Sequence, residues 1–536
     1  MSVLLPPLKG NIVDYLFEPS LGSSMKDRAF LLTPDGQVTF RQLYERVCQV
    51  GNWLTGLGVR PGDRVMFSVL DGVDFISLFL GAIKIGAVSL PINTFLTAKD
   101  YGYYIQDSGA SVVVVDGSLK TSIDEVAASQ GLPEHVFIIG SSEPGYPDFR
   151  SAVNEQSRFV QTYPSNVRDT AFWLYSSGST GAPKGVPHTH EHIYASTELF
   201  GINALNIGSE DVLLCPPKMF FAFGLGFQTY MPLRACAQVI VDPRPARADR
   251  ILDNLVHYRP TLLVAVPTLF SGLSALIRDL PDETTRAAFG RLRFGVSGGE
   301  VLAPSVMKEW QRLTGTEILD GVGTTEMTHM FIINRPGRVV LGSCGKTVEG
   351  YTVRLVDENW NDVPVGQVGN MFAAGPSAAT EYWNKPEKTR TTMRDGGVLT
   401  GDKFYQDADG NFYYVGRNDD MLRVGGIWVS PAEIESALAE HPDVNECAVI
   451  GVEDENQLVK PKAYVVLRAG VAGSPQIEES ILQLMRAELA HYKCPKWIEF
   501  VDDLPKTATG KIQRFKLRHI TQNPGYEQLA GNRQSA

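Results

Sequence analysis

A stretch rich in glycine and hydroxyl side chains, residues 175–185 (YSSGSTGAPKG), directly follows a short apolar run at 171–175. Backbone N–H groups of small residues and side-chain hydroxyls can wrap a polyphosphate, and Lys184 adds a positive charge. Pro183 stands where a Walker loop needs the glycine before its lysine, so that motif is excluded. The stretch predicts a phosphate-binding loop of another kind, formed by Ser176, Ser177, Gly178, Ser179, Thr180, Gly181 and Lys184.

Further short polar motifs follow along the chain. Taken alone, each has an ordinary explanation, because a Thr-Glu pair often caps a helix and an Arg-Asp turn is usually a solvated surface. Together they offer carboxylates, hydroxyls and basic side chains, which are the groups that bind metal ions, sugar hydroxyls and phosphates. The motifs are SGGE at 297–300, DGVGTTE at 320–326, TGD at 400–402 with GRNDD at 416–420, and PKTATGKIQR at 505–514.

Apolar runs alternate with amphipathic stretches between about residues 64 and 304. This alternation predicts an α/β class with mostly parallel sheets covered by helices, and such folds bind ligands at the carboxyl ends of their strands. We predict buried strands at 64–70, 110–116, 171–175, 238–241, 261–266 and 293–297, and helices at 73–85 and 190–200.

The pattern changes after about residue 342 and again after residue 414. Strands at 351–357 and 368–374 predict a small β-rich subdomain, and a set of about 100 residues near the end has the size of a separate α+β domain. The predicted organisation is an N-terminal domain 1–418, with the β-rich subdomain at 342–418, a C-terminal domain 419–522 and a loose tail 523–536. Within the C-terminal domain we predict helices at 431–440 and 477–489 and strands at 444–452, 460–467 and 496–501.

Composition restricts the function classes. The chain has 536 residues, 43% hydrophobic and 20% charged, which is typical of a globular enzyme rather than a disordered chain. The formal net charge of -11 argues against nucleic acid as a partner. The six cysteines form no CxxC pair, so zinc and redox motifs are unsupported and a reducing compartment is expected. We find no signal peptide and no uncharged apolar run long enough for a membrane span, and we expect a cytoplasmic protein without a membrane partner.

The five motifs, in this order, resemble those of the adenylate-forming superfamily of acyl-CoA synthetases, peptide adenylation domains and luciferases. The resemblance extends over roughly residues 10–520. It implies an AMP-forming acid–thiol ligase that converts a carboxylate into an acyl-adenylate and then into a thioester. The implied cofactors are ATP, Mg²⁺ and coenzyme A.

By this resemblance, individual residues acquire expected roles in nucleotide binding. Lys511 is the catalytic lysine, assisted by Lys184, and Thr180 and Glu326 hold Mg²⁺ and contribute to catalysis. Asp402 binds the ribose and Arg417 the nucleotide. The remaining nucleotide-binding residues border the adenine or contact phosphate: Gly299, Glu300, Asp320, Gly321, Gly323, Thr324 and Thr325.

The resemblance also implies movement of the C-terminal domain. Asp419 falls at the position of the hinge, and the domain after it is expected to swing between an adenylating and a thioester-forming pose. In the second pose a narrow channel for the pantetheine arm of coenzyme A is expected, lined by Arg423, Gly425, Gly426 and Trp428.

The runs KMFFAFGLG at 218–226 and EMTHMF at 326–331 resemble the benzoate–CoA ligase branch, which has a Phe-Phe-Ala-Tyr-Gly-Leu-Gly run and a Thr-Glu-Met-x-His string. Phe223 replaces that tyrosine, and Thr328 and Met330 replace an aliphatic pair. Benzoate, a substituted benzoate such as 4-hydroxybenzoate, and a small heteroaryl acid therefore remain open. The implied acid pocket is formed by Phe221, Ala222, Phe223, Gly298, Thr328, His329 and Met330.

Alternatives remain at this stage. The acid could be another small carboxylate, and the acceptor could be the phosphopantetheine thiol of a separate carrier protein, although no carrier domain is visible in the sequence. In another class, the chain could be a catalytically silent acyl- or nucleotide-binding scaffold. The sequence leaves open whether the protein is a homodimer, where the nucleotide part of coenzyme A binds and whether lysine acetylation regulates it.

Overall fold

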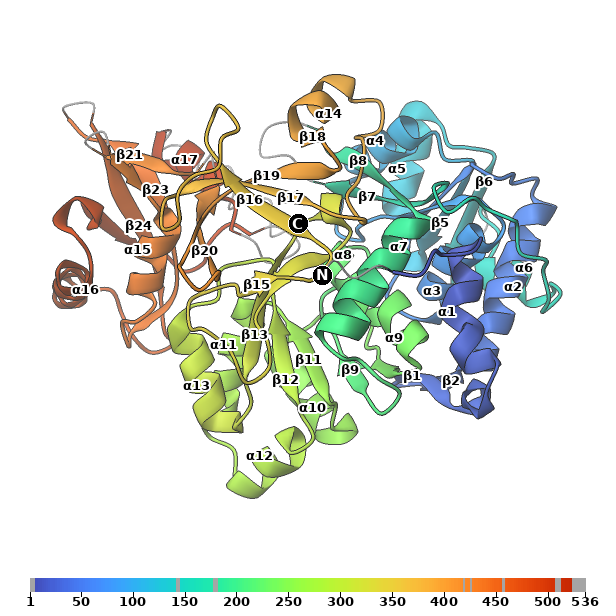
Figure 1. Ribbon diagram of the computed structural model, residues 1–536, viewed down its shortest axis with the longest axis horizontal. Helices are drawn as coiled ribbons and strands as arrows, with labels where there is room; N and C mark the ends of the chain where they lie inside the picture. The colour runs from blue at the N-terminus through green and yellow to red at the C-terminus, as the bar shows by residue number, and fades with distance from the viewer. Residues whose placement is uncertain are drawn as a thin grey trace.

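The computed structural model describes residues 5–140, 145–176, 182–417, 420–424, 427–455, 458–506 and 512–522 (Figure 1). Two large sheets with helices on both faces form most of the molecule, and smaller, mostly antiparallel sheets follow in the second half of the chain. This architecture confirms the predicted α/β class. No helix in these ranges is long and apolar enough to cross a membrane.

The first large sheet has six strands, all parallel except the last, which forms a hairpin with its neighbour. Successive residues of its strands pack into different cores: Val112 and Val114 face one side, and Val113 and Val115 face the other. Strands buried on both faces explain the continuous apolar runs in the sequence. In spatial order the strands are β6 (His135–Ile139), β5 (Val112–Asp116), β3 (Arg64–Ser68), β4 (Val88–Pro91), β7 (Thr170–Ser176) and β8 (Lys184–Thr189).

The second large sheet has nine strands among the described residues. Its centre is parallel, and antiparallel strands close both edges. In spatial order the strands are β15 (Lys346–Thr347), β14 (Met330–Ile333), β13 (Ile318–Gly323), β12 (Phe294–Ser297), β11 (Leu262–Ala265), β9 (Val212–Leu214), β10 (Gln238–Ile240), β1 (Ala29–Thr33) and β2 (Gly36–Thr39).

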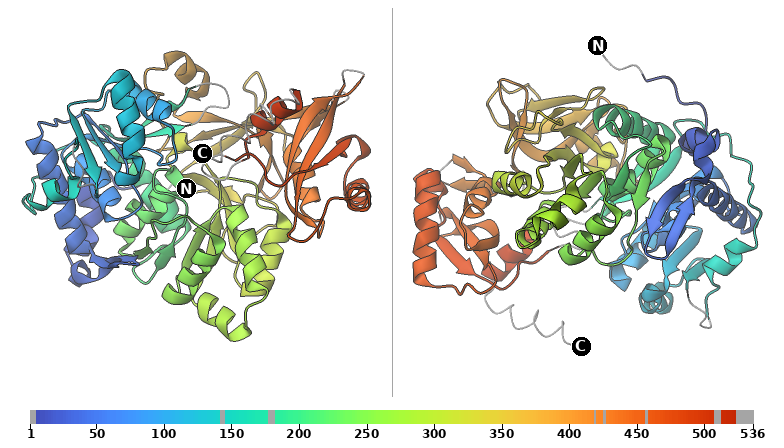
Figure 2. Two further views of the ribbon diagram at one scale, coloured as in Figure 1. Left: turned by 180° about the vertical axis from the view of Figure 1, so that it is seen from behind. Right: turned by 90° about the horizontal axis from the view of Figure 1, so that it is seen from below.

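Smaller sheets occupy the second half of the chain, and the sheet that contains β23 and β24 lies at one end of the molecule (Figures 1 and 2). An antiparallel five-stranded sheet comes first, and a short hairpin and a three-stranded sheet belong to the C-terminal part. The strands are β16 (Thr352–Val356), β17 (Gly369–Ala374), β18 (Met393–Arg394), β19 (Gly397–Gln406), β20 (Phe412–Arg417), β21 (Leu422–Val424), β22 (Ile427–Val429), β23 (Val444–Glu453), β24 (Val459–Leu467) and β25 (Trp497–Phe500).

Helices cover the two large sheets on both faces (Figure 2). In the first half of the chain they are α1 (Ile12–Leu21), η1 (Ser24–Asp27), α2 (Phe40–Gly56), α3 (Val73–Lys84), α4 (Ala98–Ser108), η2 (Gly117–Leu119), α5 (Lys120–Gln130), α6 (Phe149–Asn154), α7 (His190–Ser196), η3 (Thr197–Ala204), α8 (Ala222–Gln228), α9 (Tyr230–Ala235) and α10 (Ala248–Tyr258). In the second half they are α11 (Pro267–Ile277), α12 (Asp282–Phe289), α13 (Pro304–Thr314), η4 (Thr325–Met327), α14 (Pro386–Thr392), α15 (Pro431–Leu438), α16 (Pro475–Glu488), η5 (His491–Lys493) and α17 (Arg514–Gln522).

The predicted helix at 190–200 changes character partway along. Its start follows from a capping box, in which the Thr189 side chain accepts from the His192 backbone and the His192 side chain returns to Thr189. After Ser196 the chain continues as the π-helix η3. A π-helical turn is rare and frequently accompanies a functional site, and this one carries Phe200 into the aromatic cluster described below.

Candidate active site

The carboxylate of Glu326 lies at the meeting point of three segments far apart in sequence. Its Oε1 accepts hydrogen bonds from the Ser176 hydroxyl at 3.0 Å and from the Tyr382 hydroxyl at 2.8 Å. Ser176 ends β7, where the phosphate loop is predicted to begin, so Glu326 contacts the first residue of the predicted loop. The structure thus brings together two residues that the sequence analysis selected from separate motifs.

Lys184 begins β8, on the far side of the predicted loop. Its ammonium lies over the Tyr382 ring, 4.4 Å from the ring centroid. Burial lowers the pKa of Lys184, the Glu326 carboxylate opposes that shift, and the positive charges of Lys388 and Arg417 add to it. Lys184 is therefore influenced by other positive charges as well as by Glu326, an environment that suits a polyanionic ligand.

The hairpin that frames the predicted loop is held from the side by Trp383. Its indole N–H donates to the Asp107 carbonyl at 3.0 Å, and its backbone N–H donates to the Gly185 carbonyl at 2.9 Å. The Asp107 carboxylate accepts from the Tyr175 hydroxyl at 2.9 Å. These contacts fix both strands of the hairpin before any ligand binds.

His188, on β8, holds the segment that carries Glu326. Its Nε2 donates to the Thr325 carbonyl at 2.8 Å, and its Nδ1 lies 3.0 Å from the Thr328 hydroxyl. Burial lowers the pKa of His188 well below its usual value, so the ring is neutral and Nδ1 is an acceptor. Thr328 has a φ of 67°, a costly conformation for a β-branched residue, and contacts of this kind maintain such strain.

The residues predicted to border an adenine lie where β12, β13 and β14 meet. Asp320 of β13 pairs with Ser297 of β12, and burial raises the pKa of Asp320 to about 8. Added Cβ atoms would lie 2.7 Å from the Ile332 carbonyl oxygen at Gly321 and 2.7 Å from the His329 carbonyl oxygen at Gly323. Both glycines are therefore required for the close approach of β14, in addition to any contact with a ligand.

Asp402 and Arg417 lie opposite each other on the antiparallel strands β19 and β20. The Arg417 Nε is 3.8 Å from the Asp402 Oδ1. Gly401 has a φ of 80°, and a Cβ added to it would lie 3.3 Å from the guanidinium of Arg417. The two residues predicted for the ribose and the nucleotide are thus neighbours on one sheet.

The predicted acid pocket coincides with an aromatic cluster around His329. The imidazole lies 4.9 Å from the ring centroid of Phe200, 5.1 Å from that of Phe227 and 6.1 Å from that of Phe223. Phe223 and Phe227 come from α8 and Phe200 comes from η3. Aromatic side chains in such a cluster pack well against other flat apolar rings.

Met330 closes the cluster on the side of Gly298. A Cβ added to Gly298 would overlap the Cε of Met330 and would lie 3.7 Å from Cε2 of Phe223. Ala222 and Phe221 are partly exposed at the start of α8. Thr328 differs from these residues, because its hydroxyl lies 2.9 Å from the Ser377 carbonyl as well as near His188, and it is 1% exposed. The Thr328 hydroxyl therefore stabilises the protein chain itself and is not a free polar group that could contact a ligand.

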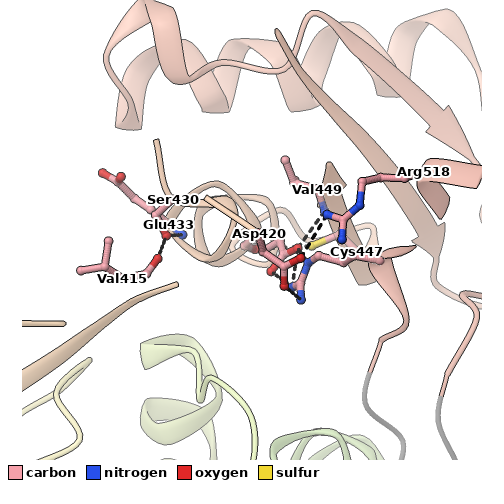
Figure 3. Close-up of polar contacts among 9 residues, drawn as sticks. Val415, Asp420, Ser430, Glu433, Cys447, Val449 and Arg518 are labelled. Atoms are coloured by element: carbon pink, nitrogen blue, oxygen red, sulfur yellow. Dashed lines mark hydrogen bonds and ion pairs between the residues drawn. The ribbon is translucent and has the colours of Figure 1, made fainter. Parts of the chain in front are cut away.

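A network of charged groups lies where the C-terminal part begins (Figure 3). The Arg514 guanidinium donates to both carboxylate oxygens of Glu435, at 2.8 and 2.7 Å, and lies 3.8 Å from Asp420. Arg518 donates to Asp420 at 3.0 Å. The Ser430 hydroxyl donates to the Val415 carbonyl of β20, which links α15 to the five-stranded sheet. The start of α17 is thereby tied to the residue after the predicted hinge.

Several predicted site residues lie outside the described residues. They are Ser177, Gly178, Ser179, Thr180, Gly181, Asp419, Gly425, Gly426 and Lys511. For Arg423 and Trp428 the structure describes the backbone, in which they pair across the β21–β22 hairpin. The remaining nucleotide-site residues are described: Gly299 has a φ of 88°, Thr324 precedes the turn η4, and Glu300 is partly exposed.

The sequence analysis missed three residues that the structure places at the site. His188 and Tyr382 contact the Glu326 segment directly, and Phe200 lines the aromatic cluster. A signal for His188 was present in the sequence. Side chains alternate between the two faces of a strand, so His188 lies on the same face of β8 as Lys184 of the phosphate motif. Tyr382 and Phe200 lie in stretches without a recognisable motif.

Comparison with known proteins identifies the family of the chain. The family model described as AMP-binding enzyme matches residues 19–383, and the model described as AMP-binding enzyme C-terminal domain matches residues 433–511. A benzoate–CoA ligase of Thauera aromatica is 42% identical over 515 residues, which are 96% of this chain and 96% of that protein.

Two solved structures are similar over almost the whole chain. The anthranilate CoA ligase AuaEII in complex with anthranoyl-AMP has a TM-score of 0.91 and 40% identity, covering 96% of this chain and 98% of that one. A benzoate CoA ligase from Burkholderia xenovorans LB400 has a TM-score of 0.87 and 38% identity, covering 95% of this chain and 99% of that one.

Proposed function

Because the chain belongs to the AMP-binding enzyme family, we propose that it is an ATP-dependent aryl acid–CoA ligase that forms an aryl-adenylate and then an aryl-CoA thioester. One observation carries the proposal. The segment 325–330 runs directly from Glu326, beside the predicted phosphate loop, to His329 and Met330 in the aromatic cluster. This continuity supports a proposed nucleotide site and a proposed acid site that lie end to end.

In the first half-reaction, an oxygen of the aryl carboxylate attacks the α-phosphorus of ATP, and the bond to pyrophosphate breaks. Two negatively charged groups must approach each other, so nearby cations stabilise the transition state. Lys184 is placed near the predicted phosphate loop, and we assign Lys511 to the reacting oxygens. In the second half-reaction the coenzyme A thiolate attacks the acyl carbonyl, and AMP leaves.

The proposed site fits a Mg²⁺ ion, which Glu326 would help to hold when ATP is bound. The Ser176 and Tyr382 hydroxyls both bind Oε1, which orients the carboxylate as groups around metal ligands commonly do. Mg²⁺ in nucleotide sites is usually held by one or two carboxylates and the substrate phosphates, and Thr180 is the other residue that we assign to it. The ion would neutralise phosphate charge. No cluster of three or more His, Cys, Asp or Glu side chains that could hold a metal occurs in the described ranges.

The remaining assignments rest on the motifs of the family. Asp402 and Arg417, opposite each other on β19 and β20, are assigned to the ribose and the nucleotide. Asp419 is assigned to the hinge, and the β21–β22 hairpin is assigned to the coenzyme A channel. A domain boundary at 418/419, a homodimeric assembly and a cytoplasmic location stay predictions.

The proposal is tested by measuring AMP and pyrophosphate release with ATP, Mg²⁺, coenzyme A and a panel of aromatic and aliphatic acids. We expect AMP release with a benzoate-type acid and formation of its CoA thioester. Activity with aliphatic acids alone would contradict the aryl assignment. Adenylation without thioester formation from coenzyme A would favour a carrier-protein thiol, and the absence of pyrophosphate release with every acid would favour a silent scaffold.

Lys511→Ala supplies the mechanistic control. We expect adenylation to fall roughly 10²-fold or more, as when one electrostatic stabiliser of a transition state is removed. Thioester formation from preformed aryl-adenylate should change little, because the proposed alternate pose does not use this lysine. Equal loss of both half-reactions would contradict the swing of the C-terminal domain.

A further inference from the structure

The imidazole of His329 has one hydrogen-bonding atom that the protein satisfies and one that it does not. His329 is 3% exposed, and its Nε2 lies 3.3 Å from the carbonyl oxygen of Phe223. Because a carbonyl oxygen can only accept, Nε2 carries the ring proton. Nδ1 has no hydrogen-bond partner among the described residues.

The unpaired atom is an acceptor. Burial lowers the pKa of His329 to about 3, so the ring is neutral at physiological pH and Nδ1 keeps its lone pair. The aromatic rings that surround the imidazole offer it no conventional donor. A buried acceptor without a donor is costly, and such atoms are few in folded proteins.

The neighbours of Gly226 show the direction in which Nδ1 of His329 points. A Cβ added to Gly226 would lie 2.6 Å from Cδ2 and 2.8 Å from Nε2 of His329. The Cδ2–Nε2 edge therefore faces α8, and Nδ1 is the ring atom opposite that edge. Nδ1 is directed away from α8, and the next residue, Met330, extends over Gly298, where the acid is proposed to lie.

We infer that the acid activated by this enzyme carries a hydrogen-bond donor, a hydroxyl or amino group, on its aromatic ring, and that Nδ1 of His329 accepts from it. The inference rests on the proposed function, because it takes the aromatic cluster as the acid pocket. A ring without a donor would leave the lone pair unpaired in the complex. A site that hydrogen-bonds a substrate group discriminates strongly against analogues that lack the group.

The test compares acids that differ only in the donor. Aminobenzoates are paired with methylbenzoates, and hydroxybenzoates with fluorobenzoates, at the 2, 3 and 4 positions. For each acid, kcat/KM is measured from AMP release with coenzyme A present. We expect the donor-bearing acid to exceed its partner by roughly 10-fold or more at one ring position. Equal values in every pair would overturn this inference and leave the proposed function intact, whereas no release with any aromatic acid would overturn the proposed function.

His329→Phe keeps an aromatic ring in the cluster and removes the lone pair. In this variant we expect the ratio of kcat/KM between the two acids of each pair to fall toward the ratio that their intrinsic reactivities give. Ser274→Ala is the matched control, because Ser274 lies on α11 and its hydroxyl is also buried without a partner in the described part of the chain. A His329→Phe enzyme with an unchanged preference would overturn the inference. Should this variant fail to fold, the acid pairs on the unaltered protein decide alone.

Discussion

The Nε2 atom of His188 donates a hydrogen bond of 2.8 Å to the carbonyl oxygen of Thr325, across the space between two sheets. His188 belongs to the strand that follows the predicted phosphate loop, and Thr325 precedes the carboxylate proposed for Mg²⁺. One buried imidazole thus helps to set the position of the two segments proposed to bind phosphate relative to each other.

His188→Leu should lower kcat for adenylation by about 10-fold and destabilise the fold by roughly 1–3 kcal/mol, because the Thr325 carbonyl loses its buried donor. Pyrophosphate release and thermal unfolding measure the two effects. His190→Leu is the control: His190 is equally buried and accepts from the Ile12 backbone, away from this segment. Equal losses of kcat in both variants would argue against a positioning role for His188.

Tyr382→Phe should weaken the response to Mg²⁺ more than the response to the acid. The substitution removes one of two hydroxyls that orient Glu326, a loss of about 1 kcal/mol or several-fold in the Mg²⁺ concentration needed for half-maximal rate. Titration of the initial rate with Mg²⁺ at saturating acid provides the measurement. Tyr351→Phe is the control, since the Tyr351 hydroxyl pairs with Ser377 and not with Glu326. An unchanged Mg²⁺ response would remove Tyr382 from this role.

Arg514→Met should impair adenylation and unfold the C-terminal part at lower temperature. Burial opposes the charge of Arg514, but Glu435 outweighs it and raises the pKa of the guanidinium. Removing one partner of a buried pair costs about 3 kcal/mol. Adenylation and thioester formation are measured separately, because only the former is expected to need Lys511, close in sequence to Arg514.

Two further variants serve as controls for the result with Arg514→Met. Arg514→Lys retains the charge but not the paired contacts with Glu435, so partial recovery is expected. Arg486→Met removes an exposed pair with Glu479 and should have little effect. Equal loss of both half-reactions in Arg514→Met would indicate a purely structural role for the network in Figure 3.

Asp320 should make the protein less stable as the pH rises. Burial raises the pKa of its carboxyl from 3.8 to about 8, so the folded state holds a proton that the unfolded chain has already released. The stability that the protonated Asp320 contributes is fully present below about pH 4 and is lost as the pH rises to about 8. Asp320→Asn should flatten this slope, measured as denaturant unfolding free energy between pH 5.5 and 8.5. A slope identical to that of the unaltered protein would show that Asp320 does not titrate in this range.

Much of the fold follows from local sequence patterns. The run at 110–116 is apolar at successive positions because β5 is buried on both faces, and this pattern predicts a central parallel strand. Short strands such as β4 and β9 lack a long enough run to be recognised. The π-helix η3 also has no sequence signature, since its extra residue per turn depends on packing against its neighbours.

The candidate site likewise contains residues that the sequence reveals and residues that only the structure reveals. Glu326 and Lys184 were recognisable because their neighbours in sequence have the types that phosphate and metal chemistry needs. Tyr382 was not recognisable, because its contact with Glu326 spans 56 residues and nothing near it in sequence suggests a role. The support of Thr328 by His188 spans 140 residues, and sequence alone assigned that hydroxyl to the acid pocket.

By itself the sequence determined which chemical groups are available: a stretch rich in hydroxyls and glycines, carboxylates and lysines, in motifs whose order resembles that of one family. Only the tertiary structure decided which side chains hold these groups in place and which atom in the aromatic cluster remains unpaired. The physical reason is that residue types and local spacing are encoded along the chain, whereas hydrogen-bond satisfaction and burial are properties of contacts between segments far apart in it.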